Sequence, residues 1–128
     1  MKLLGVEKKF FEFVNSSNIM VDNCNFEMLP TTHTPILESF GIIFTDDKGK
    51  YFYTSDTNDF KNAKQFVKNE QIKKIYCEAS WKSYNAHIEY EMLKEIKCDK
   101  LVLMHFEDID LCNLAIKDGF NVATISKE

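Results

Sequence analysis

The second half of the chain alternates short apolar runs with stretches of helical periodicity, and no other feature of the sequence constrains the fold as strongly. The apolar runs cover residues 72–77, 101–104 and 122–125, and each has the length of a buried strand. Between them, apolar residues recur every three or four positions, as they do on one face of a helix. Strands that alternate with helices form a sheet covered by crossover helices. The sequence therefore predicts an α/β domain.

Three helices can be placed by their capping residues. Asn58 or Asp59 is expected to cap the first helix and Asn85 the second, while Asp108 begins a third that stops at Gly119. The apolar stripes expected to face the sheet are Phe60, Ala63, Phe66 and Val67 in the first helix, Ile88, Met92, Leu93 and Ile96 in the second, and Leu111, Leu114 and Ala115 in the third.

The first half of the chain has the pattern of extended structure. Residues 18–28 resemble two short extended pieces, and a loop is expected over residues 30–35, which Pro30 and Pro35 bracket. A hairpin follows, with strands over residues 39–45 and 51–54 and turn-forming residues at 46–49.

The composition fits one globular domain over residues 1–128. The chain has 128 residues, 45% of them hydrophobic, and shows no repeat or linker that would mark a boundary. The net charge is −4, and all 16 basic residues are lysines. Without arginine there is no bidentate phosphate grip, so extended nucleic-acid binding is not expected.

The four cysteines show no close pair of the kind that builds zinc knuckles or redox sites, so we expect reduced thiols. We find neither a signal-peptide pattern nor an apolar run of transmembrane length. The sequence therefore predicts a cytoplasmic protein with no membrane partner.

Polar residues that can carry chemistry follow the predicted strands. Asp56, Glu78 and His105 each lie at a carboxyl end of a strand, where loops and helix N-termini converge in sheets of this kind. His87 is expected to open the second helix, and His33 lies in the loop before the hairpin. Histidine and aspartate converging on one edge are the ligands that a divalent metal such as Zn²⁺ requires, although each histidine taken alone could be an ordinary surface residue.

Several short segments carry a family resemblance. They are Thr32-His33-Thr34-Pro35 with Ser39-Phe40-Gly41, Tyr53-Thr54-Ser55-Asp56-Thr57, Cys77-Glu78-Ala79-Ser80 with Ala86-His87, and Leu103-Met104-His105-Phe106. In this order, over residues 19–125, they resemble the later motifs of the metallo-β-lactamase superfamily. The resemblance implies the C-terminal half of an αββα sandwich, classed as α/β or α+β, with a mixed sheet covered by helices.

The resemblance also implies roles for individual residues. His33 would be a ligand of one metal, Asp56 the carboxylate that bridges two metals, and His105 a ligand of the other. Zinc is the expected metal, with manganese or iron as alternatives. Glu78 and His87 resemble a catalytic pair of the ribonuclease Z-like and phosphodiesterase-like branch, in which the glutamate orients a histidine that assists the leaving oxygen. The alternative is that Glu78 and His87 only cap or solvate their loop.

The superfamily's His-x-His-x-Asp-His motif has no counterpart in this sequence. The chain is therefore expected to supply only part of the metal site, and one face of its sheet should lack a partner layer. An exposed apolar face favours association with an N-terminal half-domain or a second copy of the chain. Phe10, Phe11, Phe13 and Val14 could belong to that surface or pack on the chain's own sheet.

The sequence thus favours part of a metal-dependent phosphodiester hydrolase, inactive or weakly active alone. The acidic balance argues for a small nucleotide-type substrate. Two alternatives remain: a non-catalytic binding module that is a degenerate remnant of the fold, and a receiver-like α/β domain with Asp56 at a strand end. The second is disfavoured, because no acidic pair follows a first strand.

Overall fold

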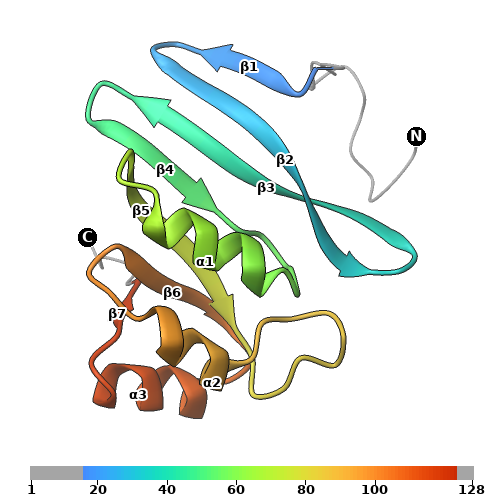
Figure 1. The fold of residues 1–128 in the computed structure, drawn as a ribbon, viewed down its shortest axis with the longest axis vertical. Coiled ribbons are helices and arrows are strands. Elements are labelled where there is room, and N and C mark those ends of the chain that lie inside the picture. The colour runs from blue at the N-terminus through green and yellow to red at the C-terminus, as the bar shows by residue number, and fades with distance from the viewer. Residues whose placement is uncertain (1–15, 124–128) are drawn as a thin grey trace, which may run out of the picture.

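Seven strands lie in one sheet in the same order as in the sequence (Figure 1). The computed structural model describes residues 16–123. The strands are β1 (Asn18–Val21), β2 (Cys24–Thr34), β3 (Leu37–Asp46), β4 (Gly49–Tyr53), β5 (Ile72–Ala79), β6 (Leu101–Phe106) and β7 (Asn121–Val122). The pairings from β1 to β4 are antiparallel, and those from β4 to β7 are parallel. The sheet is therefore mixed, as expected, and the antiparallel meander rules out a receiver-like domain.

The connections between the parallel strands are helical. They are α1 (Phe60–Lys68), α2 (Tyr90–Leu93) continued by the 3₁₀ turn η2 (Lys94–Ile96), and α3 (Ile109–Lys117). Two predicted caps are confirmed: Asp59 accepts a hydrogen bond from the backbone N–H of Asn62 at 2.9 Å, and Asp108 accepts one from Leu111 at 2.8 Å. Gly119 follows α3 with a φ of 76°, the left-handed conformation predicted there. No helix within residues 16–123 is long and apolar enough to cross a membrane.

The predicted cap at Asn85 is wrong. Asn85 lies in a loop with a φ of 58°, and α2 begins only at Tyr90, after the cap position Glu89. The cause is an isolated parallel bridge between Ser80 and Glu89, which keeps the backbone extended up to the start of the helix. His87 therefore lies in this loop and does not open a helix.

The predicted loop over residues 30–35 is also wrong for most of its length, because β2 continues through Pro30 to Thr34. The register of β2 on β3 places Pro30 opposite Phe40, whereas β1 pairs only with residues 24–27. Beyond β1 this stretch of β2 is an edge, where a missing backbone N–H is tolerated. The pairing of β2 with β3 is irregular between Thr31 and Thr34, and this irregularity is what remains of the predicted loop.

One face of the sheet carries the core. Ile43, Phe52, Ile75 and Leu103 point to this face and are buried together with residues from all three helical connections. The members from the helices are Ala63, Tyr90, Leu93, Ile96, Leu111 and Ala115. The predicted first and third stripes are thereby confirmed in their central residues. Gly41 packs so closely on the Phe52 ring that an added Cβ would lie 2.7 Å from Phe52 Cε2.

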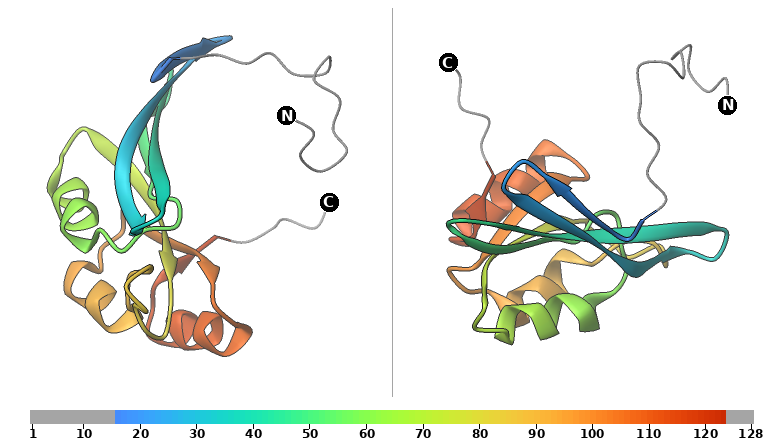
Figure 2. Two further views of the ribbon diagram at one scale, coloured as in Figure 1. Left: turned by 90° about the vertical axis from the view of Figure 1, so that its right-hand side faces the viewer. Right: turned by 90° about the horizontal axis from the view of Figure 1, so that it is seen from above.

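The opposite face of the sheet is apolar and only partly buried. Its side chains line a shallow hollow of about 300 Å³, and they are Phe26, Ile42, Phe44, Tyr53, Tyr76 and Met104. Within residues 16–123 the helices lie away from this face over β2 and β3 (Figure 2). We call it the bare face. Residues 124 and 125 of the predicted last strand, and the four apolar residues between Phe10 and Val14, lie outside the described residues.

Candidate metal centre

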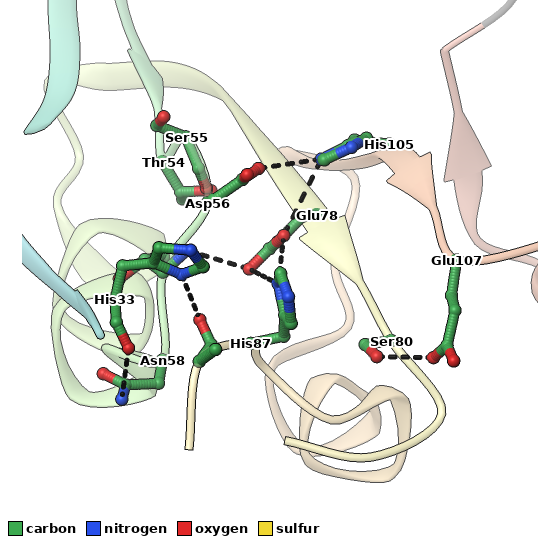
Figure 3. Close-up of polar contacts among 12 residues, drawn as sticks. His33, Thr54, Ser55, Asp56, Asn58, Glu78, Ser80, His87, His105 and Glu107 are labelled. Carbon is green, nitrogen blue, oxygen red and sulfur yellow. Dashed lines mark hydrogen bonds and ion pairs between the residues drawn. The ribbon is translucent and has the colours of Figure 1, made fainter. Parts of the chain in front are cut away.

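The carboxyl ends of the three central parallel strands bring the predicted polar residues together. Asp56 follows β4, Glu78 is the second-last residue of β5, and His105 is the second-last residue of β6 (Figure 3). Donor atoms of these three side chains all lie within 4.8 Å of one another. Parallel strands end at one edge of a sheet, so residues far apart in the sequence become neighbours there.

Asp56 and His105 form the open side of the centre. His105 Nδ1 lies 2.9 Å from Asp56 Oδ1, and the two side chains are 57% and 42% exposed. His105 has a φ of 51°, and Ser55, the residue before Asp56, has a φ of 58°. Residues other than glycine seldom adopt this conformation, and such strain is concentrated at functional sites. We call Asp56 and His105 the open pair.

Glu78 and His87 form the closed side. Nδ1 of His87 lies 3.0 and 2.9 Å from the two oxygens of Glu78, whose side chain is only 4% exposed. The backbone N–H of Thr57 donates to Glu78 Oε1 at 2.8 Å. Burial raises the pKa of Glu78, against the lowering effect of the Thr57 N–H and of His87. We call Glu78 and His87 the closed pair. Because Nδ1 of His87 is engaged, its Nε2 is the nitrogen left for chemistry.

His33 does not join the group of three. Its Nδ1 donates to the carbonyl oxygen of Ala86 at 2.7 Å, and its ring centre lies 5.1 Å from that of His87. This bond fixes the tautomer and leaves Nε2 of His33 as an acceptor or ligand atom. The structure thus places His33 beside the closed pair, and its role as a metal ligand stays a prediction.

Two supporting residues were missed by sequence reasoning. Asn58 is one of two residues predicted to cap α1; Asp59 is the cap, and Asn58 Nδ2 donates to the carbonyl oxygens of His33 at 3.2 Å and Asn85 at 2.7 Å. Thr57 donates through Oγ1 to the carbonyl oxygen of Thr32 at 2.7 Å. Together they tie the end of β2 to the segment after β4. No spacing in the sequence marks these contacts, because they join strands through backbone carbonyls.

A cavity of about 290 Å³ opens beside the centre. It is lined by Glu78, Ala79, Ser80, Tyr84, His87, His105, Phe106 and Glu107. The closed pair and His105 of the open pair therefore line the same cavity. Ser80 Oγ donates to Glu107 Oε2 at 2.6 Å on the side away from Asp56 (Figure 3).

The chemistry of these donors fits a divalent metal. Asp56 and Glu78 offer carboxylate oxygens and His105 offers an imidazole nitrogen, which zinc, manganese and iron all accept. A metal at this point would also offset the cost of burying the Glu78 carboxylate among few counter-charges.

Two solved structures share the fold. One is the metallo-β-lactamase fold protein YhfI from Bacillus subtilis, with a TM-score of 0.60 and 17% identity over 92% of this chain and 53% of that one. The other is isothiocyanate hydrolase from Delia radicum gut bacteria, with a TM-score of 0.56 and 12% identity over 89% of this chain and 56% of that one. This chain thus spans about half the length of either protein, and its fold is the corresponding part of the metallo-β-lactamase fold.

Among curated proteins, none matches the chain. Residues 7–123 match a protein family, that of the anti-Pycsar protein Apyc1. That match spans the whole sheet, all three helical connections and every residue of the centre. The expected superfamily resemblance is confirmed, and the chain belongs to the anti-Pycsar protein Apyc1 family.

Proposed function

We propose that this chain is part of a metal-dependent hydrolase that acts on phosphodiesters of small nucleotides. The observation that carries the proposal is the joining of the open pair and the closed pair: His105 Nδ1 lies 2.9 Å from Asp56 and 3.7 Å from Glu78, which in turn binds His87. In a site of two metals, His33 would be a ligand of one metal, His105 of the other and Asp56 of both. A divalent metal would polarise the phosphoryl oxygens and lower the pKa of water.

The closed pair supplies the proton chemistry. In its doubly protonated form, His87 keeps its Nδ1 proton and donates a hydrogen bond through it to Glu78, and the buried carboxylate stabilises the positive ring. The Nε2 proton then passes to the departing alkoxide when the P–O bond breaks, which leaves a neutral His87 and an alcohol. Glu78 acts as a positioning residue, because it fixes the tautomer and orientation of the ring.

A small substrate suits the cavity. Its volume of about 290 Å³ lies at the lower end of the range for small-molecule sites. The chain also has a net charge of −4 and no arginine, so nothing in its composition favours a long polyanion.

The bare face is the surface on which the rest of the fold would pack. The two solved structures are about twice the length that this chain covers, and the bare face is apolar where β2 to β6 would need a covering layer. We propose that an N-terminal half of the fold, carrying the absent histidine and aspartate ligands, occupies this face. The chain alone would then be weakly active.

The first test measures metal content. Elemental analysis of the zinc-loaded and dialysed chain should show bound zinc that His105→Ala abolishes. A chain that retains no zinc in either form would show that it holds no metal without the N-terminal half. It would favour the second candidate, a binding module that keeps the fold without the chemistry, for which the exposed bare face is the favouring observation.

The second test separates proton donation from metal chemistry. His87→Gln should slow hydrolysis of 3′,5′-cyclic AMP about 10²- to 10⁴-fold, because its alkoxide leaving group needs a proton. The same variant should barely affect bis(4-nitrophenyl) phosphate, whose leaving group departs as a stable anion. Equal losses on both substrates would show that His87 holds the metal and donates no proton.

A further inference from the structure

The loop between β5 and α2 presents an aromatic side chain at the rim of the cavity. Tyr84 is 67% exposed, yet it lines the same cavity as His87, His105 and Glu78. Phe106, at the end of β6, lines that cavity too. A largely exposed tyrosine in a loop contributes little to folding, so its position beside the centre points to a role in binding.

The backbone under Tyr84 is held in an unusual conformation. Tyr84 and Asn85 have φ angles of 47° and 58°, a left-handed pair in a loop where neither residue is glycine. Such a pair costs free energy and persists only when the surroundings determine it. Hydrogen bonds hold this conformation on the side of the metal centre. The backbone carbonyl of Asn85 accepts from the Asn58 side chain, and that of Ala86 accepts from His33 Nδ1.

Hydrogen bonds also hold the other end of the loop, at Trp81 and Ser83. The backbone N–H of Trp81 donates to Glu107 Oε2 at 2.9 Å, and its indole N–H donates to Asp108 Oδ2 at 2.8 Å. The backbone N–H of Ser83 donates to Glu89 Oε1 at 3.1 Å. Tyr84 therefore projects from a loop that is anchored on both sides, which is how a binding residue is preorganised.

We propose that Tyr84 is a substrate-binding residue that stacks on the heteroaromatic base of the substrate. A planar base carries no charge that the acidic wall of Glu78 and Glu107 would repel, and every base has a π-face for an aromatic side chain. The side of the cavity formed by His87 and His105 would then face the phosphodiester, and the two aromatic side chains would face the base. The inference rests on the proposed function for its substrate class, but its test needs neither metal nor hydrolysis.

The chain carries its own reporter for this contact. Trp81 is the single tryptophan of the sequence and lies in the same loop as Tyr84. In nitrogen-15-labelled protein its indole N–H gives one well-separated resonance. Titration of the full chain with adenosine, and separately with D-ribose as a probe without a base, reads out binding by the shift of this resonance.

The expected result is a saturable shift with adenosine and none with ribose. Tyr84→Ala should weaken adenosine binding by roughly tenfold, while Tyr84→Phe should retain it because the ring is kept. Ile116→Ala, which changes an exposed apolar residue on α3, is the matched control and should bind as the wild type does. Equal binding by Tyr84→Ala, or no base-dependent binding by the wild type, would overturn the inference. Neither result would touch the metal and leaving-group tests of the proposed function.

Discussion

Two histidine–carboxylate pairs share one edge of the sheet, and they differ in how far each is removed from water. In the closed pair, Glu78 is almost fully buried and accepts from His87 and from the Thr57 backbone. In the open pair, Asp56 and His105 are both about half exposed, and a single contact of 2.9 Å joins them. Several contacts and burial determine the closed pair, whereas an incoming cation can replace the exposed contact between Asp56 and His105 at little cost. The same residue types are thus suited to proton transfer on one side and to metal binding on the other.

Zinc affinity is the most direct test of this difference between the two pairs. Asp56→Ala should lower the affinity by more than about 100-fold because it removes a ligand, whereas Glu78→Gln should lower it by about 10- to 100-fold, as loss of a supporting contact does. Competition with a chromophoric chelator measures both values, and Ile116→Ala serves as the control. If Glu78→Gln had the larger effect, Glu78 would be the principal ligand and the division between the two pairs would be wrong.

For the free energy of unfolding, the order should be reversed: loss of Glu78 should have a larger effect than loss of Asp56. Glu78→Ala leaves the buried N–H of Thr57 without its acceptor and should lower the free energy of unfolding by about 1 to 3 kcal/mol. Asp56→Ala removes an exposed contact and should change it by less than about 1 kcal/mol. Urea unfolding of the two variants with a chelator present, followed by circular dichroism, provides the measurement. Equal losses would mean that the open pair is also a structural element.

The closed pair should also leave a signature in the pH dependence of stability. Burial raises the pKa of Glu78 in the folded state, so the folded chain holds this proton more tightly than the unfolded chain. By linkage, the contribution of Glu78 to stability falls as the pH rises from the ordinary glutamate pKa of about 4.3 to the raised value, and is constant above it. Glu78→Gln should remove this fall. Parallel curves for wild type and variant between those limits would argue against a raised pKa.

Much of this arrangement could be predicted from the sequence, because local patterns carry it. The helical stripes, the caps at Asp59 and Asp108 and the left-handed Gly119 depend on neighbours within one or two turns. The apolar strand pattern also predicts Asp56, Glu78 and His105 at strand ends, where the structure brings them together.

What the sequence could not supply depends on contacts between distant segments. The extension of β2 past Pro30 needs β3 as a partner, and the loop around Asn85 needs the bridge from Ser80 to Glu89. For the same reason Asn58 looked like a cap. Its two carbonyl partners, His33 and Asn85, lie on segments that only the folded sheet brings near it.

The smallest expected effect concerns His33, which could both stabilise the fold and bind metal. His33→Ala removes the bond to Ala86 and should lower the free energy of unfolding by about 0.5 to 1.5 kcal/mol. It should also lower zinc affinity, but by less than Asp56→Ala does, because His33 lies outside the group formed by Asp56, Glu78 and His105. The two readouts separate the two roles: the free energy of unfolding reports the contact through Nδ1, and zinc affinity reports metal binding through Nε2. Zinc affinity unchanged within about twofold would refute the ligand role, and His33 would then only position the loop that carries His87.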